Sequence, residues 1–479
     1  MFSILGSGAS SSTPWLQCLI SGKNCCAVCD DCRRNPLTSR NIRNNVSALL
    51  SIPSSNGIDL HHVMIDAGKT MRQSVMKWFP PFGVQALAAV VLTHPHADAF
   101  LGLDDLRDLS PRRLLPVYLS RRCFDVVKNA FSYLVPEGSI AKRHEKFGYG
   151  IQQTSDETSG GGAAATVSCC APATTFVAMI EWRIFNAWEP FVIPEANNVI
   201  VTPVPVQHGV GRNNISFAFE FGLQLDKAED KEEQQDFIME ENKINDKIDV
   251  TINSEFVSST SQALSQSVFE IDSQNEKSVV TSREKEKRVL SIEPGGPVED
   301  DCSAAPNLTL PPFKGSRILY ISDVSSISPT ARLFFRARPT DLLFLDLLNY
   351  ARYSTHFNAQ QAVNCAADIR ATKARFVGIN HAMDHEIEHE FMQSIGSSLM
   401  SGKLDLGLAH DGLRFSFTLS SISSKNGLET LRKDISSVRN ACSIAGVEED
   451  DPSLLVDYYK PMLVELLPEN SPTKTRNAQ

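Results

Sequence analysis

The run Thr93-His94-Pro95-His96-Ala97-Asp98, which contains three side chains able to bind a metal, directly follows the apolar stretch Ala88 to Leu92. Two imidazoles two residues apart at a strand end can converge on one cation, and the carboxylate two residues further on can reach a second cation beside it. The alternative is a pair of surface histidines in a loop. Because the chain has only 11 histidines, a chance match is rare, so the run predicts a metal centre.

Further candidate ligands occur at the ends of other strand-like runs. His208 follows Val199 to Val206, Asp323 follows the run ending at Ile321, and His381 follows the run ending at Ile379. Each of these residues alone could be an ordinary turn residue. Their shared position after apolar runs predicts that they join His94, His96 and Asp98 in one site.

The elements that must position these residues are predicted from apolar periodicity and turn signals. They are nine strands and one helix, Ala359 to Ile369. The strands are expected at Phe2 to Leu5, Val46 to Ile52, His62 to Ile65, Ala89 to Leu92, Val199 to Val206, Ser216 to Phe221, Arg317 to Ile321, Leu342 to Leu345 and Arg375 to Ile379. Strands alternating with helices indicate a layered fold of both element types.

The composition of the 479-residue chain indicates how the rest of it is divided into a domain, insertions and an extension. Residues 152–173 are rich in Gly, Ala, Ser and Thr, and residues 226–312 are charged and polar, so both are predicted to be disordered insertions in one domain, 1–420. A partly disordered extension, 421–479, follows. A net charge of -10 argues against a nucleic-acid partner. Without a signal peptide or membrane-length apolar run, a cytoplasmic location is expected.

The ordered set of histidines and aspartates resembles the metallo-β-lactamase superfamily, whose fold is a four-layer αββα sandwich with metals at one rim. More narrowly, it is similar to the PhnP-type cyclic phosphodiesterase branch. That narrower similarity rests on Leu5 to Ser10 with Pro14, the cysteine-rich segment, Gly102 to Leu106, Tyr320 to Val324, Thr355 to Asn358 and His381 to His385. The expected fold class is therefore α+β, as this sandwich with two long loop insertions.

The resemblance assigns roles to the candidate ligands. It implies one metal on His94, His96 and His208, a second on Asp98 and His381, and Asp323 between them. Ala99 stands where the family usually has a histidine, so the second site should bind more weakly, recruit another ligand or stay empty.

The chain has 11 cysteines, of which five lie between Cys18 and Cys32, and this crowding favours metal ligation over disulfides. Cys26 and Cys29 have the spacing of a zinc-binding pair. By resemblance, a structural zinc is expected on Cys18, Cys26, Cys29 and His385, with Cys25 and Cys32 as competitors for the place of Cys18. A reduced surface cluster is the alternative.

The resemblance also places His356 at the substrate, where it could donate a proton to the leaving oxygen or hold a phosphoryl oxygen. If the second metal is absent, Asp98 is expected to position or deprotonate the attacking water. Asp66 and Asp346 are expected to support the ligand loops.

The predicted function is hydrolysis of small cyclic phosphodiesters with one or two catalytic zinc ions, or Mn²⁺ in their place, and one structural zinc. Three alternatives stay open: a tRNA 3′-processing endonuclease, a thioester or lactone hydrolase, and a non-catalytic zinc-binding scaffold. A small phosphodiester is the expected partner, a membrane is not, and a homodimer is left open.

Overall fold

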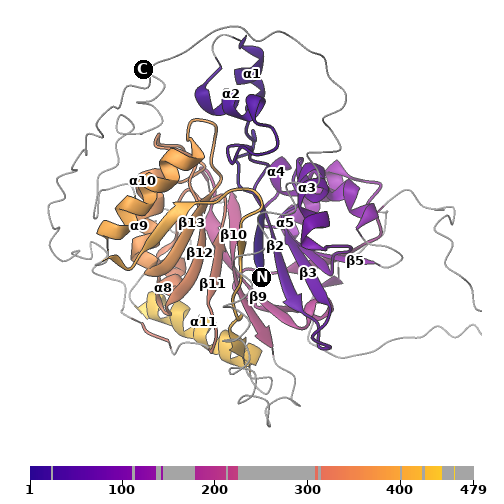
Figure 1. The fold of residues 1–479 in the computed structure, drawn as a ribbon. Coiled ribbons are helices and arrows are strands. Elements are labelled where there is room, and N and C mark those ends of the chain that lie inside the picture. The colour runs from indigo at the N-terminus through magenta and orange to yellow at the C-terminus, as the bar shows by residue number, and fades with distance from the viewer. Residues whose placement is uncertain are drawn as a thin grey trace, which may run out of the picture. The chain divides into compact units, whose positions relative to one another are not determined.

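The computed structural model describes residues 1–22, 25–109, 114–135, 142–143, 178–211, 214–224, 308–310, 314–399, 402–422, 427–444 and 458. The chain divides into two units, residues 1–225 with 296–479 and residues 226–295, and the second unit lies outside the described residues. The predicted insertion 152–173 also lies outside them, as does most of 226–312. The fold is therefore that of the first unit (Figure 1).

The first sheet contains the N-terminal strands and runs parallel from β3 through β4 and β5 to β7. All five residues of β1 are buried, because this sheet is covered on both faces. In spatial order its strands are β15 (Arg414–Phe415), β1 (Phe2–Gly6), β2 (Ser47–Pro53), β3 (Leu60–Ile65), β4 (Ala89–Val91), β5 (Leu115–Ser120), β7 (Ile180–Phe185) and β6 (Lys142–Arg143).

The second sheet is parallel from β11 through β12 and β13 to β14, whereas β10 is antiparallel to both β11 and β9. Two reversals give β9 the same direction as β11, so the carboxyl ends of β9, β11, β12 and β13 share one edge. The strands in order are β14 (Asp405–Leu408), β13 (Ala371–Val377), β12 (Thr340–Asp346), β11 (Ile318–Ile321), β10 (Ile215–Gln224), β9 (Val199–Gln207) and β8 (Phe191–Ile193), with β16 (Ser421–Ile422) beside β10.

Helices cover the outer faces of the two sheets. One apolar core lies between the sheets, where the rings of Phe2 and Phe344 stack with centroids 4.5 Å apart. A second core joins the second sheet to α8 (Pro329–Arg336), α9 (Ala359–Ile369), α10 (His385–Ser398) and α11 (Gly427–Ile444). A third joins the first sheet to α3 (Met71–Phe82), α5 (Arg121–Ala130) and the 3₁₀ helix η2 (Leu103–Asp108). The predicted four-layer αββα arrangement is confirmed.

Local sequence signals explain where several helices begin and end. Ser328 caps α8 by accepting a hydrogen bond from the Ala331 N–H, with Pro329 at the first helical position. Asn358 and Gln361 form a capping box at the start of α9. Gly83, with a φ of 70°, ends α3 in the left-handed conformation.

Every strand predicted from the sequence is present, and α9 has the predicted bounds. Helices α3, α5, α8 and α10 were not predicted, nor were β5 and β7. Helix α11, within the predicted extension 421–479, packs through Ile435 and Val438 into the core of the second sheet; the boundary at 420 stays a prediction. Among the described residues, no helix combines the length and the apolar character needed to cross a membrane.

The ends of the two sheets meet where the candidate ligands lie. Asp66 and His94 follow the parallel strands β3 and β4, and the Phe217 N–H of β10 donates to the Thr93 carbonyl oxygen at 3.1 Å. This bond joins the loop after β4 to the edge of the second sheet where β9, β11, β12 and β13 end. Residues far apart in the chain are thereby brought to one rim.

Candidate metal centre

Three imidazoles, from His94, His96 and His208, gather where β4 and β9 end. Their ring centroids are 4.7, 4.9 and 5.0 Å apart. His208 Nε2 lies 3.1 Å from His96 Nδ1, and one ring nitrogen of each residue lies within 4.8 Å of the others. His94 and His208 are buried, whereas His96 is exposed. Three convergent imidazoles, with one side open to solvent, suit a divalent cation.

The tautomer of His94 is set by two neighbouring side chains. Thr93 Oγ1 donates to Asp66 Oδ2 at 2.7 Å and lies 2.8 Å from His94 Nδ1. A hydroxyl that donates its proton to Asp66 can accept from His94 Nδ1–H, which leaves a lone pair on Nε2. His94 Nε2 is buried and has no hydrogen-bond partner. Burial lowers the pKa of His94 to about 3, so this unpartnered nitrogen is available as a ligand.

His208 is oriented in the same way by a backbone carbonyl. Its Nδ1 lies 2.7 Å from the carbonyl oxygen of Thr355, which can only accept, so the proton is on Nδ1. The lone pair of Nε2 then points at His96. Such hydrogen bonds to the non-ligating nitrogen are typical of metal-binding histidines.

Asp323 completes this side of the centre. It follows β11, has a φ of 52°, and is buried. Positive φ is strained for an aspartate and is found where the surrounding structure holds a functional residue in place. Burial opposes ionisation, but His94, His208 and His356 together hold the pKa of Asp323 below its ordinary value. Asp323, His208 and His356 also each offer one ligand atom within 4.8 Å of the others.

Asp98 lies in α4 (Ala97–Phe100), at the edge of this group. Its Oδ1 is 3.8 Å from His94 Nε2. Burial, followed by the negative charge of Asp323, raises the pKa of Asp98, which makes its carboxylate a better proton acceptor than an ordinary aspartate. Ala99, in the same helix, is buried and offers no ligand atom.

His356 lies beside the centre and is held by a buried carboxylate. Its Nδ1 is 2.9 Å from Asp346 Oδ2 and 3.8 Å from Asp323 Oδ1. Burial alone would lower the pKa of His356, but Asp346 and then Asp323 raise it to about 9. The ring is therefore an imidazolium near neutral pH, with its centroid 5.0 Å from that of His208.

Asp346 also ties together the ends of three strands. Its Oδ2 accepts from the backbone N–H of Val324, at 3.1 Å, and of Phe357, at 3.3 Å. Its Oδ1 faces Gly378, the residue that follows β13, where φ is 77° and where an added Cβ would lie 2.3 Å from that oxygen. Asp346 thus fixes the loop of Asp323 and the ring of His356 together.

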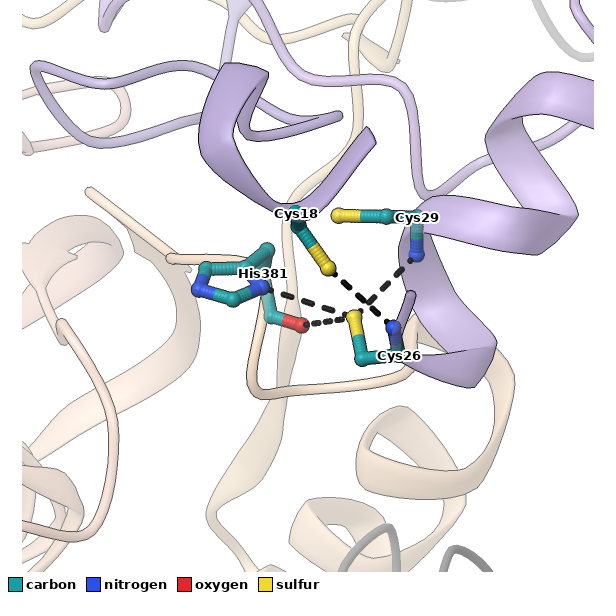
Figure 2. Close-up of side chains that lie close together, drawn as sticks. All are labelled: Cys18, Cys26, Cys29 and His381. Carbon is teal, nitrogen blue, oxygen red and sulfur yellow. Dashed lines mark hydrogen bonds between the residues drawn. The ribbon is translucent and has the colours of Figure 1, made fainter. Parts of the chain in front are cut away.

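The cysteines form a second group (Figure 2), in which the structure gathers Cys18, Cys26, Cys29 and His381. Cys18 comes from α1 (Leu16–Ile20), and Cys26 and Cys29 come from the start of α2 (Ala27–Arg34). Cys26 Sγ lies 3.4 Å from His381 Nδ1 and accepts from the Cys29 N–H, also at 3.4 Å. Hydrogen bonds from Cys29 and His381 lower the pKa of Cys26 to about 3, which favours the metal-binding thiolate.

The position of His381 differs from the expectation. The sequence placed it in the catalytic centre, and the structure places its ring beside Cys26 and against Trp15, with ring centroids 4.7 Å apart. The cause is the turn after β13. The buried Arg43 guanidinium donates to the carbonyl oxygens of Asn380, at 3.1 Å, and Met383, at 2.9 Å, which fixes the turn that carries His381 toward the cysteines.

His385, expected as the fourth ligand of the cysteines, lies elsewhere. It is the first residue of α10, after the helix cap Asp384, and its ring centroid is 5.4 Å from that of His389 and 5.3 Å from that of His410. It is 1% exposed, and burial lowers its pKa to about 2. Four residues beyond His381, it is carried into the helix and away from the sulfur atoms. Among the competitors, Cys25 Sγ is 3.9 Å from Cys18 Sγ, and Cys32 lies outside the group.

Comparison with known proteins identifies the domain. Residues 61–155 match the family model described as "Beta-lactamase superfamily domain". This part of the chain is therefore similar to a β-lactamase superfamily domain. The match includes Asp66 and the run from His94 to Asp98, and the predicted superfamily is thereby confirmed.

Individual proteins similar to this chain are more distant. An octanoyltransferase of Porphyromonas gingivalis (strain ATCC BAA-308 / W83) is 30% identical over 131 residues, which are 27% of this chain and 23% of that protein. A solved structure of a diphosphatase from the PhnP family is 20% identical with a TM-score of 0.47, covering 88% of this chain and 98% of that one. Zinc-bound PqqB from Methylobacterium extorquens is 14% identical with a TM-score of 0.46, covering 87% and 99%.

The β-lactamase superfamily fold implies a divalent metal ion, and the residues at the rim fit one. Lone pairs come from the unpartnered Nε2 of buried His94 and from Nε2 of His208, whose Nδ1 donates to Thr355, and negative charge comes from Asp323. Sequence reasoning gave no role to Thr93, Thr355, Arg43 and Trp15, which contact the ligands or the turn that carries one of them. A hydroxyl directly before His94 was a usable signal for Thr93; the other three are brought in by tertiary contacts.

Proposed function

We propose that this chain hydrolyses phosphodiesters, with small cyclic phosphates as its substrate class. The observation that carries this proposal is the pairing of a three-imidazole metal centre with the imidazolium of His356, 5.0 Å from His208 between ring centroids. A bound divalent ion would lower the pKa of a water molecule and withdraw charge from a phosphoryl oxygen. His356 would serve the opposite side of the reaction, where a leaving oxygen gains negative charge.

The chain's own residues would then handle the protons. The water oxygen forms a bond to phosphorus while the ester P–O bond breaks. Asp98, whose pKa burial raises, takes up the proton of the water, and His356 gives its Nε2 proton to the leaving oxygen. Asp346 holds His356 Nδ1 and keeps Nε2 directed at the substrate. Asp323 and Asp346 stabilise the imidazolium before the transfer.

A second candidate is hydrolysis of an acyl thioester. The support is the match of 131 residues to a protein named as an octanoyltransferase. Because that match spans only 23% of the other protein, it supports this candidate less than the charge of His356 supports the first. An ester of phosphoric acid places negative oxygens beside an imidazolium, whereas a thioester is neutral. The tRNA-processing alternative stays disfavoured by the net charge of -10.

The test is a substrate panel assayed with the full chain purified without chelator. It contains bis(p-nitrophenyl) phosphate, a 2′,3′-cyclic nucleotide and an octanoyl thioester. We expect turnover of the diesters that His94→Ala abolishes. His61→Ala is the matched control, because His61 lies in neither metal-binding group. Turnover of the thioester alone would overturn the proposal in favour of the acyl candidate, and bound metal without any turnover would favour a scaffold. The small-molecule partner, the homodimer and the cytoplasmic location stay predictions.

A further inference from the structure

The rim contains too few side chains for a second metal ion. A cation beside Asp98 would need several further ligands, because a divalent zinc ion in a protein takes about four. The neighbouring residue, Ala99, is buried and has no donor atom. Among the described residues, the groups that could hold a metal at this rim contain His94, His96, His208, Asp323 and His356, and neither includes Asp98.

The family resemblance places His381 at such a second ion, but in the structure His381 belongs to the group formed by Cys18, Cys26 and Cys29. Its Nδ1 is 3.4 Å from Cys26 Sγ, and its ring packs on Trp15. Turning this ring back to the rim would give up both contacts and would require the turn held by the Arg43 guanidinium to change. A side chain bound on both sides in this way is not free to serve a second site.

His356 is not a substitute ligand for that second ion. Its ring lies beside that of His208, with centroids 5.0 Å apart, and its ligand atom groups with those of His208 and Asp323 and not with Asp98, so His356 lies on the first ion's side of the centre. A second metal ion would therefore have only two protein ligands, the carboxylate of Asp98 and one oxygen of Asp323, which also faces the first ion. Two carboxylates without an imidazole do not make the closed set that holds zinc.

We propose that the catalytic centre binds one metal ion, through His94, His96 and His208 with Asp323 facing it, and that Cys18, Cys26, Cys29 and His381 bind the other. The chain then carries two ions, and Asp98 is not a ligand of either. This inference rests on the metal centre of the proposed function but not on its substrate, so the two can fail separately.

The test is metal content per chain by elemental analysis of the full-length protein purified without chelator. We expect two ions in the wild type, loss of one in His94→Ala, loss of the other in Cys26→Ser, and two in Asp98→Asn. His61→Ala is the control for adventitious binding, and circular dichroism reports whether each variant is folded. Three ions, one of them lost in Asp98→Asn, would overturn the inference and leave the proposed function standing. No loss in a folded His94→Ala would overturn both.

A second measurement covers the case in which a variant does not fold. Wild-type protein loaded with Mn²⁺ is examined by electron paramagnetic resonance, because two ions sharing a bridging carboxylate couple magnetically. We expect the hyperfine-split signal of an isolated ion at every Mn²⁺ ratio. A spin-coupled pair would show that the rim holds two ions and would overturn the inference without any substitution.

Discussion

The two groups of metal-binding side chains differ in what holds them. The histidine centre is carried by strand ends of both sheets. Hydrogen bonds to Thr93, Thr355 and Asp346 orient the rings of His94, His208 and His356, respectively. The cysteine group is carried by two short helices before β2, and one turn, fixed by Arg43, joins it to β13. The histidine centre holds its rings in fixed orientations and leaves one side open to solvent. The cysteine group joins an N-terminal loop to the second sheet. Changes in the first should therefore alter activity, and changes in the second should alter stability.

The largest effect is expected from His356→Asn, which removes the proton donor but leaves the three-imidazole group intact. Loss of a general acid costs about 10²–10⁴-fold in rate. We expect that loss in kcat for bis(p-nitrophenyl) phosphate, with metal content unchanged by elemental analysis. If kcat stays within a factor of two of the wild type, His356 has no part in the reaction.

A smaller effect is expected from Thr93→Val, which removes the hydroxyl that orients His94. Removal of such a partner costs about 10–100-fold in metal affinity. A competition titration with a chromogenic chelator measures the affinity, and Thr93→Ser, which keeps the hydroxyl, serves as the matched control. Equal affinities in the two variants would mean that the packing of the methyl group, and not the hydrogen bond, is what matters.

The pH dependence should sharpen the comparison further. His356 donates a proton, so activity falls as pH rises through its pKa of about 9. Asp346→Asn removes the carboxylate that contributes most to that increase, and burial then lowers the pKa toward or below its ordinary value of about 6.5. We expect the descending limb of kcat against pH to move to lower pH in this variant. An unmoved limb would assign it to a different group.

The smallest effect on activity is expected from Cys26→Ser, which removes one thiolate of the cysteine group. The wild type should lose about 3 kcal/mol of unfolding free energy on chelation when the free ion is about 100-fold above its Kd, and the variant should lose none of it. Denaturant unfolding with and without chelator measures this difference. A kcat that falls as far as in His356→Asn would contradict the division of roles between the two groups.

The fold and most of the centre could be predicted because their signals are local. Apolar runs ending in His or Asp predicted β4, β9 and β11 together with His94, His208 and Asp323. The fates of His381 and His385 could not be predicted in this way. They are four positions apart, one in the turn after β13 and one at the start of α10, and which ring reaches the sulfur atoms depends on Arg43, a residue more than 300 positions earlier in the chain. No local pattern records that contact.

Gly378 imposes a requirement that the ligand residues do not reveal. A side chain there would occupy the space of Asp346 Oδ1, 2.3 Å from the added Cβ, so the carboxylate would have to leave Val324, His356 and Phe357. A chain with every histidine of this centre but a larger residue at that position would need a new way to charge and aim its proton donor. A glycine at the position of Gly378 can therefore be used to select, from sequence alone, relatives that can hold the same His356–Asp346 pair.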